Sequence, residues 1–130
     1  MKVPPFANMA LPAQPTVLAP DGSEVRVLLS RPGGSMAHFR LPAGAASIAV
    51  AHHTVEEIWY VVSGRGQMWR RLGDAESVLD LLPGVCLTLP VGTHFQFRAA
   101  ADCALEAVAI TMPPWPGMDE AYFVPGHWTG

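Results

Sequence analysis

Apolar and polar residues alternate along most of the chain, in short runs that end at glycine or proline. Alternation with a period of two is typical of strands with one buried face, because successive side chains point to opposite faces. Turn signals such as Pro32-Gly33-Gly34 and Gly64-Arg65-Gly66 separate the runs, and no apolar stripe has a helical period. The pattern predicts strands over residues 24–29, 36–41, 47–52, 57–62, 67–72, 77–82, 85–89, 94–98 and 104–111.

Short strands with a turn about every 8–12 residues indicate an all-β antiparallel sandwich or barrel. The chain has 130 residues, half of them hydrophobic, which suits one domain with a single core. We expect three segments: a Pro-rich N-terminal arm over 1–22, a β-barrel domain over 23–112, and a tail over 113–130. The tail is rich in proline and aromatic residues, so we expect it to pack on the barrel or on a partner subunit.

The charge balance argues against nucleic acid as a partner. The chain has 11 acidic and 8 basic residues, a formal net charge of −3, whereas a phosphate backbone selects for clustered lysine and arginine. The N-terminus carries one lysine, and its prolines interrupt the apolar stretch that a signal peptide needs. No apolar run reaches the ~20 residues of a membrane helix. We therefore expect a cytoplasmic protein without a membrane partner.

The segment over 57–72 reads as a hairpin around Gly64-Arg65. In that pairing Trp59 lies opposite Arg70, on the face from which Glu57 also points. If this face is internal, Arg70 meets either Glu57 or a carboxylate of a bound molecule, since a buried arginine needs a partner. Trp59 and Arg70 are therefore candidate substrate-binding residues. The alternative is that this arginine and its neighbour both extend to solvent.

Two adjacent histidines, His52 and His53, stand shortly before Glu57. Neighbouring residues on a strand point to opposite faces, so only one of the two histidines can point into a barrel. An inward imidazole beside an inward carboxyl group can ligate a metal or exchange protons with a bound molecule. This stretch therefore holds the main candidate chemistry of the chain.

The same stretch resembles the first motif of the cupin superfamily, which reads Gly, five residues, His-x-His, three or four residues, Glu, six residues, Gly. Here Gly44 is followed by five residues, Val50-Ala51-His52, four residues, Glu57, six residues and Gly64. A count of three residues before the glutamate selects His53 instead, but only His52 also fits the spacing from the first glycine.

The second cupin motif reads Gly, five residues, Pro-x-Gly, two residues, His, and it resembles Gly84, VCLTL, Pro90-Val91-Gly92 and Thr93-His94-Phe95. The resemblance implies a cupin jelly-roll barrel, or double-stranded β-helix, of about nine to ten short antiparallel strands. Cupin metal sites use the histidines and the glutamate of the first motif with the histidine of the second. Carried over, this implies His52, Glu57 and His94 as ligands of one divalent ion, Zn, Fe, Mn or Ni.

The chain departs from the family pattern at two ligand positions. Val50 stands where the first histidine is expected, and Phe95 stands at the last position, with His94 one residue early. A slip of one residue turns a side chain to the other face of its strand, unless a bulge redirects it. His38 is a possible replacement from a neighbouring strand. The metal set is therefore expected to be incomplete.

These observations lead to one hypothesis and two alternatives. We expect a cupin-domain protein with a small-molecule pocket inside the barrel, an incomplete metal site and Glu57 as a general acid or base. The alternatives are a metal-dependent oxygenase or isomerase that acts on a small polar or anionic metabolite, and a non-catalytic barrel with a filled interior. The sequence leaves open whether the chain is an enzyme. The chain resembles small jelly-roll proteins that pair as dimers, often by exchange of terminal strands, and this resemblance implies a homodimer for which the two terminal segments offer the material.

Overall fold

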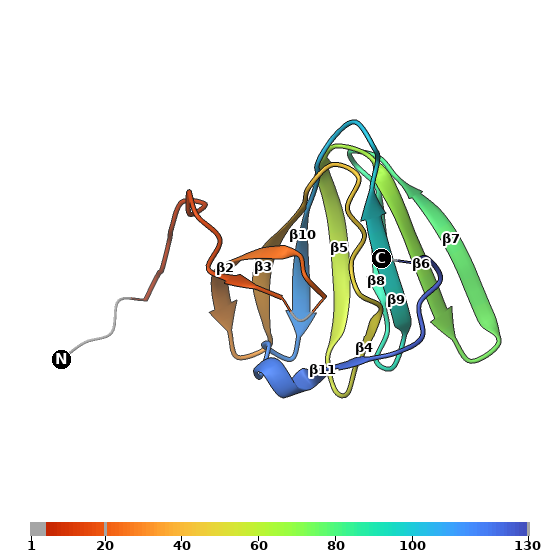
Figure 1. The fold of residues 1–130 in the computed structure, drawn as a ribbon. Helices are drawn as coiled ribbons and strands as arrows, with labels where there is room; N and C mark the ends of the chain where they lie inside the picture. The colour runs from red at the N-terminus through yellow and green to blue at the C-terminus, as the bar shows by residue number, and fades with distance from the viewer. Residues whose placement is uncertain (1–4, 20, 130) are drawn as a thin grey trace.

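The computed structural model describes residues 5–19 and 21–129, and almost all of the regular structure is β-strand. The strands predicted from alternation are confirmed, with bounds that differ by a few residues. The main exception is the range 47–52, of which only Val50–His52 forms a strand. The strands form two antiparallel sheets that face each other, as in a double-stranded β-helix (Figure 1).

The first sheet has six strands in the order β1-β2-β3-β10-β5-β8. Their bounds are β1 Val17–Leu18, β2 Glu24–Arg31, β3 Gly34–Leu41, β10 Leu105–Met112, β5 Glu56–Ser63 and β8 Cys86–Leu89. The strand β10 lies between β3 and β5, so a late segment of the chain joins two early ones.

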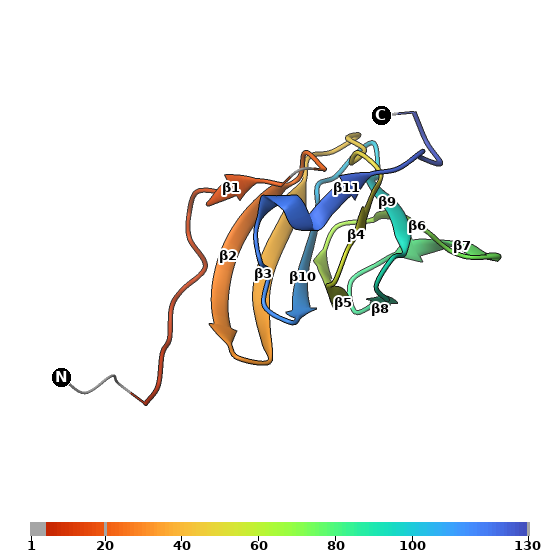
Figure 2. The ribbon, with the colours of Figure 1, turned by 90° about the horizontal axis from the view of Figure 1, so that it is seen from below.

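The second sheet has five strands in the order β11-β4-β9-β6-β7. Their bounds are β11 Ala121–Phe123, β4 Val50–His52, β9 His94–Ala99, β6 Gly66–Leu72 and β7 Ala75–Leu81. A short 3-10 helix, η1, spans Met118–Glu120 and leads directly into β11 (Figure 2). The last strand of the chain therefore pairs with the strand that carries His52.

The core lies between the sheets because each strand turns alternate side chains inward. In β5, Glu57, Trp59 and Val61 are buried, whereas Ile58 and Tyr60 are 40% and 50% exposed. The inward side chains of both sheets pack into one cluster of buried residues: Leu41, Val50, Trp59, Val61, Met68, Leu81, Leu87, Leu89, Phe95, Phe97, Ala99, Leu105, Ala107 and Ala109. Burial of this set supplies the main driving force for the fold.

The predicted hairpin around Gly64-Arg65 is wrong. The strand β5 pairs with β10 and β8 in the first sheet, whereas β6 pairs with β9 and β7 in the second. The chain therefore crosses between sheets at this turn. Gly64 has a φ of +81° there, and a Cβ on it would overlap the carbonyl group of Ala104, so the crossing requires glycine.

Both terminal segments contribute to the sheets. The expected arm over 1–22 contains β1, which pairs with β2 at the edge of the first sheet. The expected tail over 113–130 contains η1 and β11, and β11 pairs with β4 of the same chain. Among residues 5–19 and 21–129, no helix is long and apolar enough to cross a membrane.

Candidate functional site

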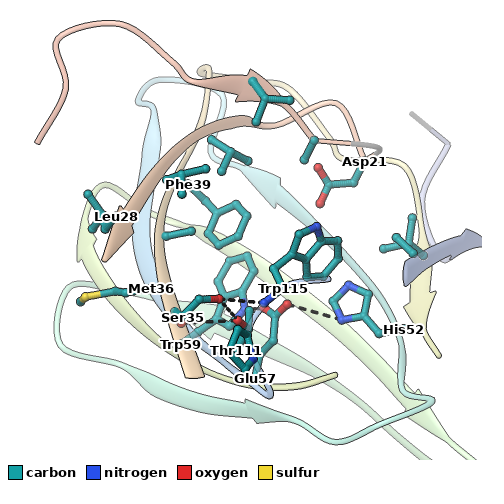
Figure 3. Close-up of a pocket in the computed structure, with 18 of the residues that line it drawn as sticks. Asp21, Leu28, Ser35, Met36, Phe39, His52, Glu57, Trp59, Thr111 and Trp115 are labelled. Carbon is teal, nitrogen blue, oxygen red and sulfur yellow. Dashed lines mark hydrogen bonds and ion pairs between the residues drawn. The ribbon is translucent and has the colours of Figure 1, made fainter. Parts of the chain in front are cut away.

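A cavity of about 260 Å³ opens between the two sheets, next to the segment that follows β10. Its walls are mostly apolar or aromatic, and its polar side chains are few (Figure 3). The polar lining consists of Asp21, Ser30, Ser35, His52, Glu57 and Thr111. A mostly apolar cavity with a few converging polar groups is the usual form of a small-molecule site. The filled core therefore occupies only part of the interior.

Glu57 contributes a buried carboxyl group to this cavity wall. It points inward because it alternates with the outward residues of β5, and it is 3% exposed. The indole Nε1 of Trp59 donates a hydrogen bond of 2.6 Å to Glu57 Oε1. Burial raises the pKa of Glu57 to about 7, against the lowering effect of the Trp59 hydrogen bond, and the nearby Asp21 carboxyl group adds to the rise.

His52 lies beside Glu57, on the facing sheet. Its Nδ1 is 3.4 Å from Glu57 Oε2. Burial lowers the pKa of His52 to about 4, so the imidazole is neutral at neutral pH, although the Glu120 carboxylate acts in the opposite direction. The ring makes edge contacts with Phe95 and Trp115, at centroid distances of 5.3 and 5.0 Å. These contacts fix its orientation toward Glu57.

Asp21 is a second buried carboxyl group in the cavity wall, and the sequence did not indicate it. It is 6% exposed, and its Oδ1 accepts hydrogen bonds from the backbone N–H and the hydroxyl group of Ser23. Burial raises the pKa of Asp21, while the bonds from Ser23 act to lower it. Asp21 stands between β1 and β2, where sequence reasoning placed only a proline-rich arm.

The segment after β10 closes one side of the cavity. The backbone N–H of Trp115 donates to Ser35 Oγ at 3.0 Å, and the hydroxyl groups of Ser35 and Thr111 form a short hydrogen bond. Trp115 is thereby held between His52 and the rest of the cavity (Figure 3). The abundance of aromatic residues in the tail was the sequence signal for such packing.

Glu120 of η1 binds the residues that follow His52 in the chain. Its carboxylate accepts hydrogen bonds from the backbone N–H groups of Thr54 and Val55, at 2.6 and 2.8 Å, and from the Thr54 hydroxyl group at 2.7 Å. Together these hydrogen bonds outweigh the effect of burial and lower the pKa of Glu120. The tail thus positions β4 through a buried carboxylate.

Two residues selected from the sequence lie outside the cavity lining. Arg70 donates from Nη1 to the backbone carbonyl oxygen of Thr88, 3.0 Å away, and it forms no ion pair with Glu57. Its predicted position depended on the β5–β6 hairpin, which does not form. His94 lies opposite Arg71 of β6, while the next residue, Phe95, lines the cavity. The alternation along β9 thus turns His94 away, because no bulge redirects it.

The two other histidines that the sequence offered as ligands are also placed elsewhere. His53 stacks on Tyr122 at a centroid distance of 4.4 Å and is exposed. His38 is buried on the outer side of β3, with Nε2 3.1 Å from Glu106 Oε1. Of the candidate residues, the structure brings together His52, Glu57 and Trp59.

The donor set does not fit the divalent ion that the resemblance implies. Val50 lines the cavity at the position of the missing histidine and pairs with Phe95 across the β4–β9 ladder. In the part of the chain that the structure describes, no three His, Cys, Asp or Glu side chains gather closely enough to hold a metal. A catalytic zinc site uses three protein ligands, and the described residues do not supply such a set.

No family model matches the chain, and no curated protein sequence matches it. Several solved structures match the chain. The capsular polysaccharide assembling protein CapF from Staphylococcus aureus is 19% identical over 78% of this chain, with a TM-score of 0.66, and this chain spans only 32% of its length. An uncharacterised double-stranded β-helix protein from Klebsiella pneumoniae is 15% identical over 80% of this chain and 85% of its own, with a TM-score of 0.66.

The nucleoside dehydratase Pac13, also solved as the Streptomyces protein with uridine, is a further match. It is 16% identical over 80% of this chain and 79% of its own, with a TM-score of 0.65. At these identities the similarity shows the fold alone.

Proposed function

We propose that this small domain with the cupin fold binds a small molecule in the cavity between its sheets and exchanges a proton with it through Glu57. The observation that carries the proposal is the contact of Glu57 with His52 in a mostly apolar cavity, where Glu57 Oε2 is 3.4 Å from His52 Nδ1. A general acid or base works best when its pKa lies near the working pH. Burial places the pKa of Glu57 at about 7, so both protonation states are populated at neutral pH.

Each neighbour of Glu57 has a distinct part in this proposal. A neutral imidazole has one N–H group and one free nitrogen, so His52 Nδ1 can donate to the ionised carboxylate or accept from the protonated acid. His52 is therefore a positioning residue for either state of Glu57. Trp59 fixes the other carboxyl oxygen and offers its ring as a binding surface for the ligand.

Two structures with the same fold contain small organic ligands, which supports a cavity of this kind. One is CapF with the inhibitor 3-isopropenyl-tropolone, and the other is Pac13 with uridine. Both proteins share less than a fifth of their residues with the matched part of this chain, so the identity of the ligand does not transfer. The proposal for this chain rests on its own cavity and on Glu57.

The proposal predicts one NMR result. The side-chain carboxyl carbon of Glu57, labelled with 13C, is expected to titrate with a midpoint near pH 7, because burial raises its pKa to about that value. Benzyl alcohol, a small uncharged probe, is expected to shift the same signal as it enters the cavity. A midpoint below about pH 5, the range of ordinary carboxyl groups, would contradict the proposed acid–base role.

A pair of matched variants locates the probe. Ala37 lines the cavity, so Ala37→Phe is expected to fill it and to abolish the shift caused by benzyl alcohol. Val62 points outward from β5 and is 48% exposed, so Val62→Phe is expected to leave the shift intact. An equal response of both variants would mean that the probe binds elsewhere.

A metal-dependent enzyme remains the alternative that the family resemblance suggested, with His52, Glu57 and His94 as ligands. Because His94 lies outside the cavity lining, we expect Zn²⁺ to raise the melting temperature by less than about 1 °C. Differential scanning calorimetry with and without Zn²⁺ measures this, and His52→Ala supplies the control. A rise of several degrees that is absent in His52→Ala would show that the protein binds Zn²⁺ through His52 and would contradict this expectation.

The homodimer and the cytoplasmic location stay predictions. The outer face of the first sheet supports the dimer, because it exposes a contiguous apolar group formed by Ile58, Tyr60, Val62 and Ile110. We expect light scattering to give the mass of two chains for the natural protein and of one chain for Ile58→Lys. A natural protein with the mass of a single chain would contradict the prediction.

A further inference from the structure

The side chains that can be charged at neutral pH in the described lining of the cavity are both acidic. Its titratable side chains are Asp21, His52 and Glu57, and the described lining contains no lysine or arginine. Arg70, which would have recognised an anionic ligand, bonds instead to a backbone carbonyl group. Because the imidazole is neutral at neutral pH, the only charge that the described lining residues can carry there is negative. An anionic ligand would meet no compensating charge in this cavity.

The two carboxyl groups approach the cavity from different parts of the fold. Asp21 comes from the segment before β2, and Glu57 comes from β5, with Trp115 between them in the close-up (Figure 3). Both hydrogen bonds that Asp21 accepts from Ser23 go to Oδ1. The Asp21 carboxyl group raises the cost of ionising Glu57, as a second negative charge in an apolar site does.

Aromatic rings form much of the remaining wall. Phe39 and Trp59 stack on each other at a centroid distance of 4.9 Å, and Phe95 and Trp115 line the side near His52. The face of an aromatic ring attracts a cation, most strongly where water is excluded. The same rings provide apolar surface for an uncharged part of a ligand.

We infer that the ligand of this cavity is a small organic ammonium ion with an apolar or aromatic body, whose cationic group is attracted by the carboxyl groups of Asp21 and Glu57 and lies among the aromatic side chains. This inference rests on the proposed function and specifies its ligand class. The ammonium N–H groups donate to a carboxylate of the lining, and the positive charge offsets the effect of Asp21 that raises the cost of ionising Glu57. Binding of the cation is thereby coupled to release of a proton from Glu57.

Three probes of similar shape test the charge preference by isothermal titration calorimetry: benzylammonium, benzyl alcohol and benzoate. At about pH 8, we expect benzylammonium to bind on the order of tenfold more tightly than benzyl alcohol, and benzoate more weakly than either. Glu57→Gln and Asp21→Asn are each expected to remove most of the preference for the cation. Glu56→Gln, which changes an exposed carboxylate on the outer side of β5, is expected to preserve it.

The pH dependence of probe binding to the natural protein is a second test, and its result does not depend on whether the variants fold. The titratable groups that face Glu57 are Asp21 and His52, and His52 stays neutral until the pH approaches about 4. Lowering the pH from about 8 to about 5.5 protonates Glu57, so benzylammonium should bind several-fold more weakly while benzyl alcohol should not.

The outcomes separate this inference from the proposed function. If benzyl alcohol or benzoate binds at least as tightly as benzylammonium, the ligand class is wrong and the cavity site stands. If none of the probes binds, both the inference and the cavity site fail. A preference for benzylammonium that survives Glu57→Gln and Asp21→Asn together would also overturn the inference, because the cation would then bind elsewhere.

Discussion

Glu57→Gln is expected to stabilise the protein at about pH 8 and to leave its stability nearly unchanged at about pH 4.5. In the folded protein the pKa of Glu57 rises from the ordinary 4.5 to about 7. The folded state therefore binds the proton more tightly than the unfolded state, and stability is lost as the pH rises from about 4.5 through about 7. The full loss corresponds to about 3 kcal/mol. Glutamine avoids this cost because it has no charge to bury.

In Glu57→Gln, the side-chain amide can retain the hydrogen bonds that Glu57 makes with its neighbours. Its oxygen can accept from the Trp59 indole N–H as Glu57 Oε1 does, and its NH₂ group can donate to His52 Nδ1. We therefore expect the melting temperature to rise by roughly 6–12 °C at about pH 8, the value that about 3 kcal/mol implies for a domain of this size. Thermal unfolding followed by circular dichroism at several pH values measures the change.

Two comparisons isolate Glu57 from the other titrating groups. Glu56→Gln removes an exposed carboxylate one residue away and is expected to change stability by less than about 0.5 kcal/mol at either pH. The lowered pKa of His52 costs stability as the pH falls from 6.5 to about 4, in both the natural protein and the variant. The difference between the two curves therefore reports Glu57. A glutamine variant that is less stable at about pH 8 would show that the carboxylate is favourably ionised.

The alternation of single strands could be read directly from the sequence. In β5, the period of two places Glu57 and Trp59 on one face and Ile58 and Tyr60 on the other, and the structure agrees. The same rule allowed only one of the two adjacent histidines to point inward; the motif spacing selected His52, which is buried in the cavity wall. These inferences held because they depend only on the geometry of one strand.

Inferences that needed to know which strands are neighbours failed. The pairing of Trp59 with Arg70 assumed that consecutive strands form a hairpin, but the chain crosses to the other sheet at Gly64. A two-residue turn and a crossing between sheets both use glycine at this point, so the local sequence does not distinguish them. The expected contact of Arg70 with Glu57 or with a ligand was lost with the hairpin.

The terminal segments hold the residues of the site that the sequence did not reveal. Asp21 and Glu120 lie in stretches where proline and glycine obscure any periodic pattern, and nothing local shows that either carboxyl group is buried. Asp21 lies in the turn between β1 and β2, where its backbone carbonyl group accepts from the distant Ile48 N–H, and Glu120 directly precedes β11, which pairs with the distant β4. Such burial depends on tertiary packing, which propensity and spacing do not encode.

Glu120→Ala is expected to destabilise the protein by about 3 kcal/mol or more at neutral pH. The Glu120 carboxylate is 6% exposed and accepts two backbone N–H groups and one hydroxyl group, from Thr54 and Val55. Alanine leaves these donors without an acceptor, and Val55 is fully buried, so water does not replace the carboxylate there. Hydrogen bonds to a charged group are worth about 1.5–3 kcal/mol each, so the loss exceeds that of an ordinary surface change.

The pH dependence of this loss has the opposite sign to that of Glu57. The hydrogen bonds lower the pKa of Glu120, so the stability that it supplies is present above 4.5 and is lost as the pH falls through its folded value. Chemical denaturation at about pH 7 and about pH 3 should therefore show a difference between the natural protein and Glu120→Ala that shrinks in acid. Asp119→Ala, on the exposed neighbour in η1, should change stability by less than about 0.5 kcal/mol.

The Glu120 variant also tests whether the tail positions the site. Because Glu120 holds the chain immediately after His52, its loss should free β4 and move the His52 ring away from Glu57. Benzyl alcohol should then bind more weakly to Glu120→Ala than to Asp119→Ala, even under conditions where both remain folded. Equal binding by the two variants would mean that β4 keeps its position without the carboxylate, and that the backbone pairing of β11 with β4 is sufficient to hold His52 in the cavity wall.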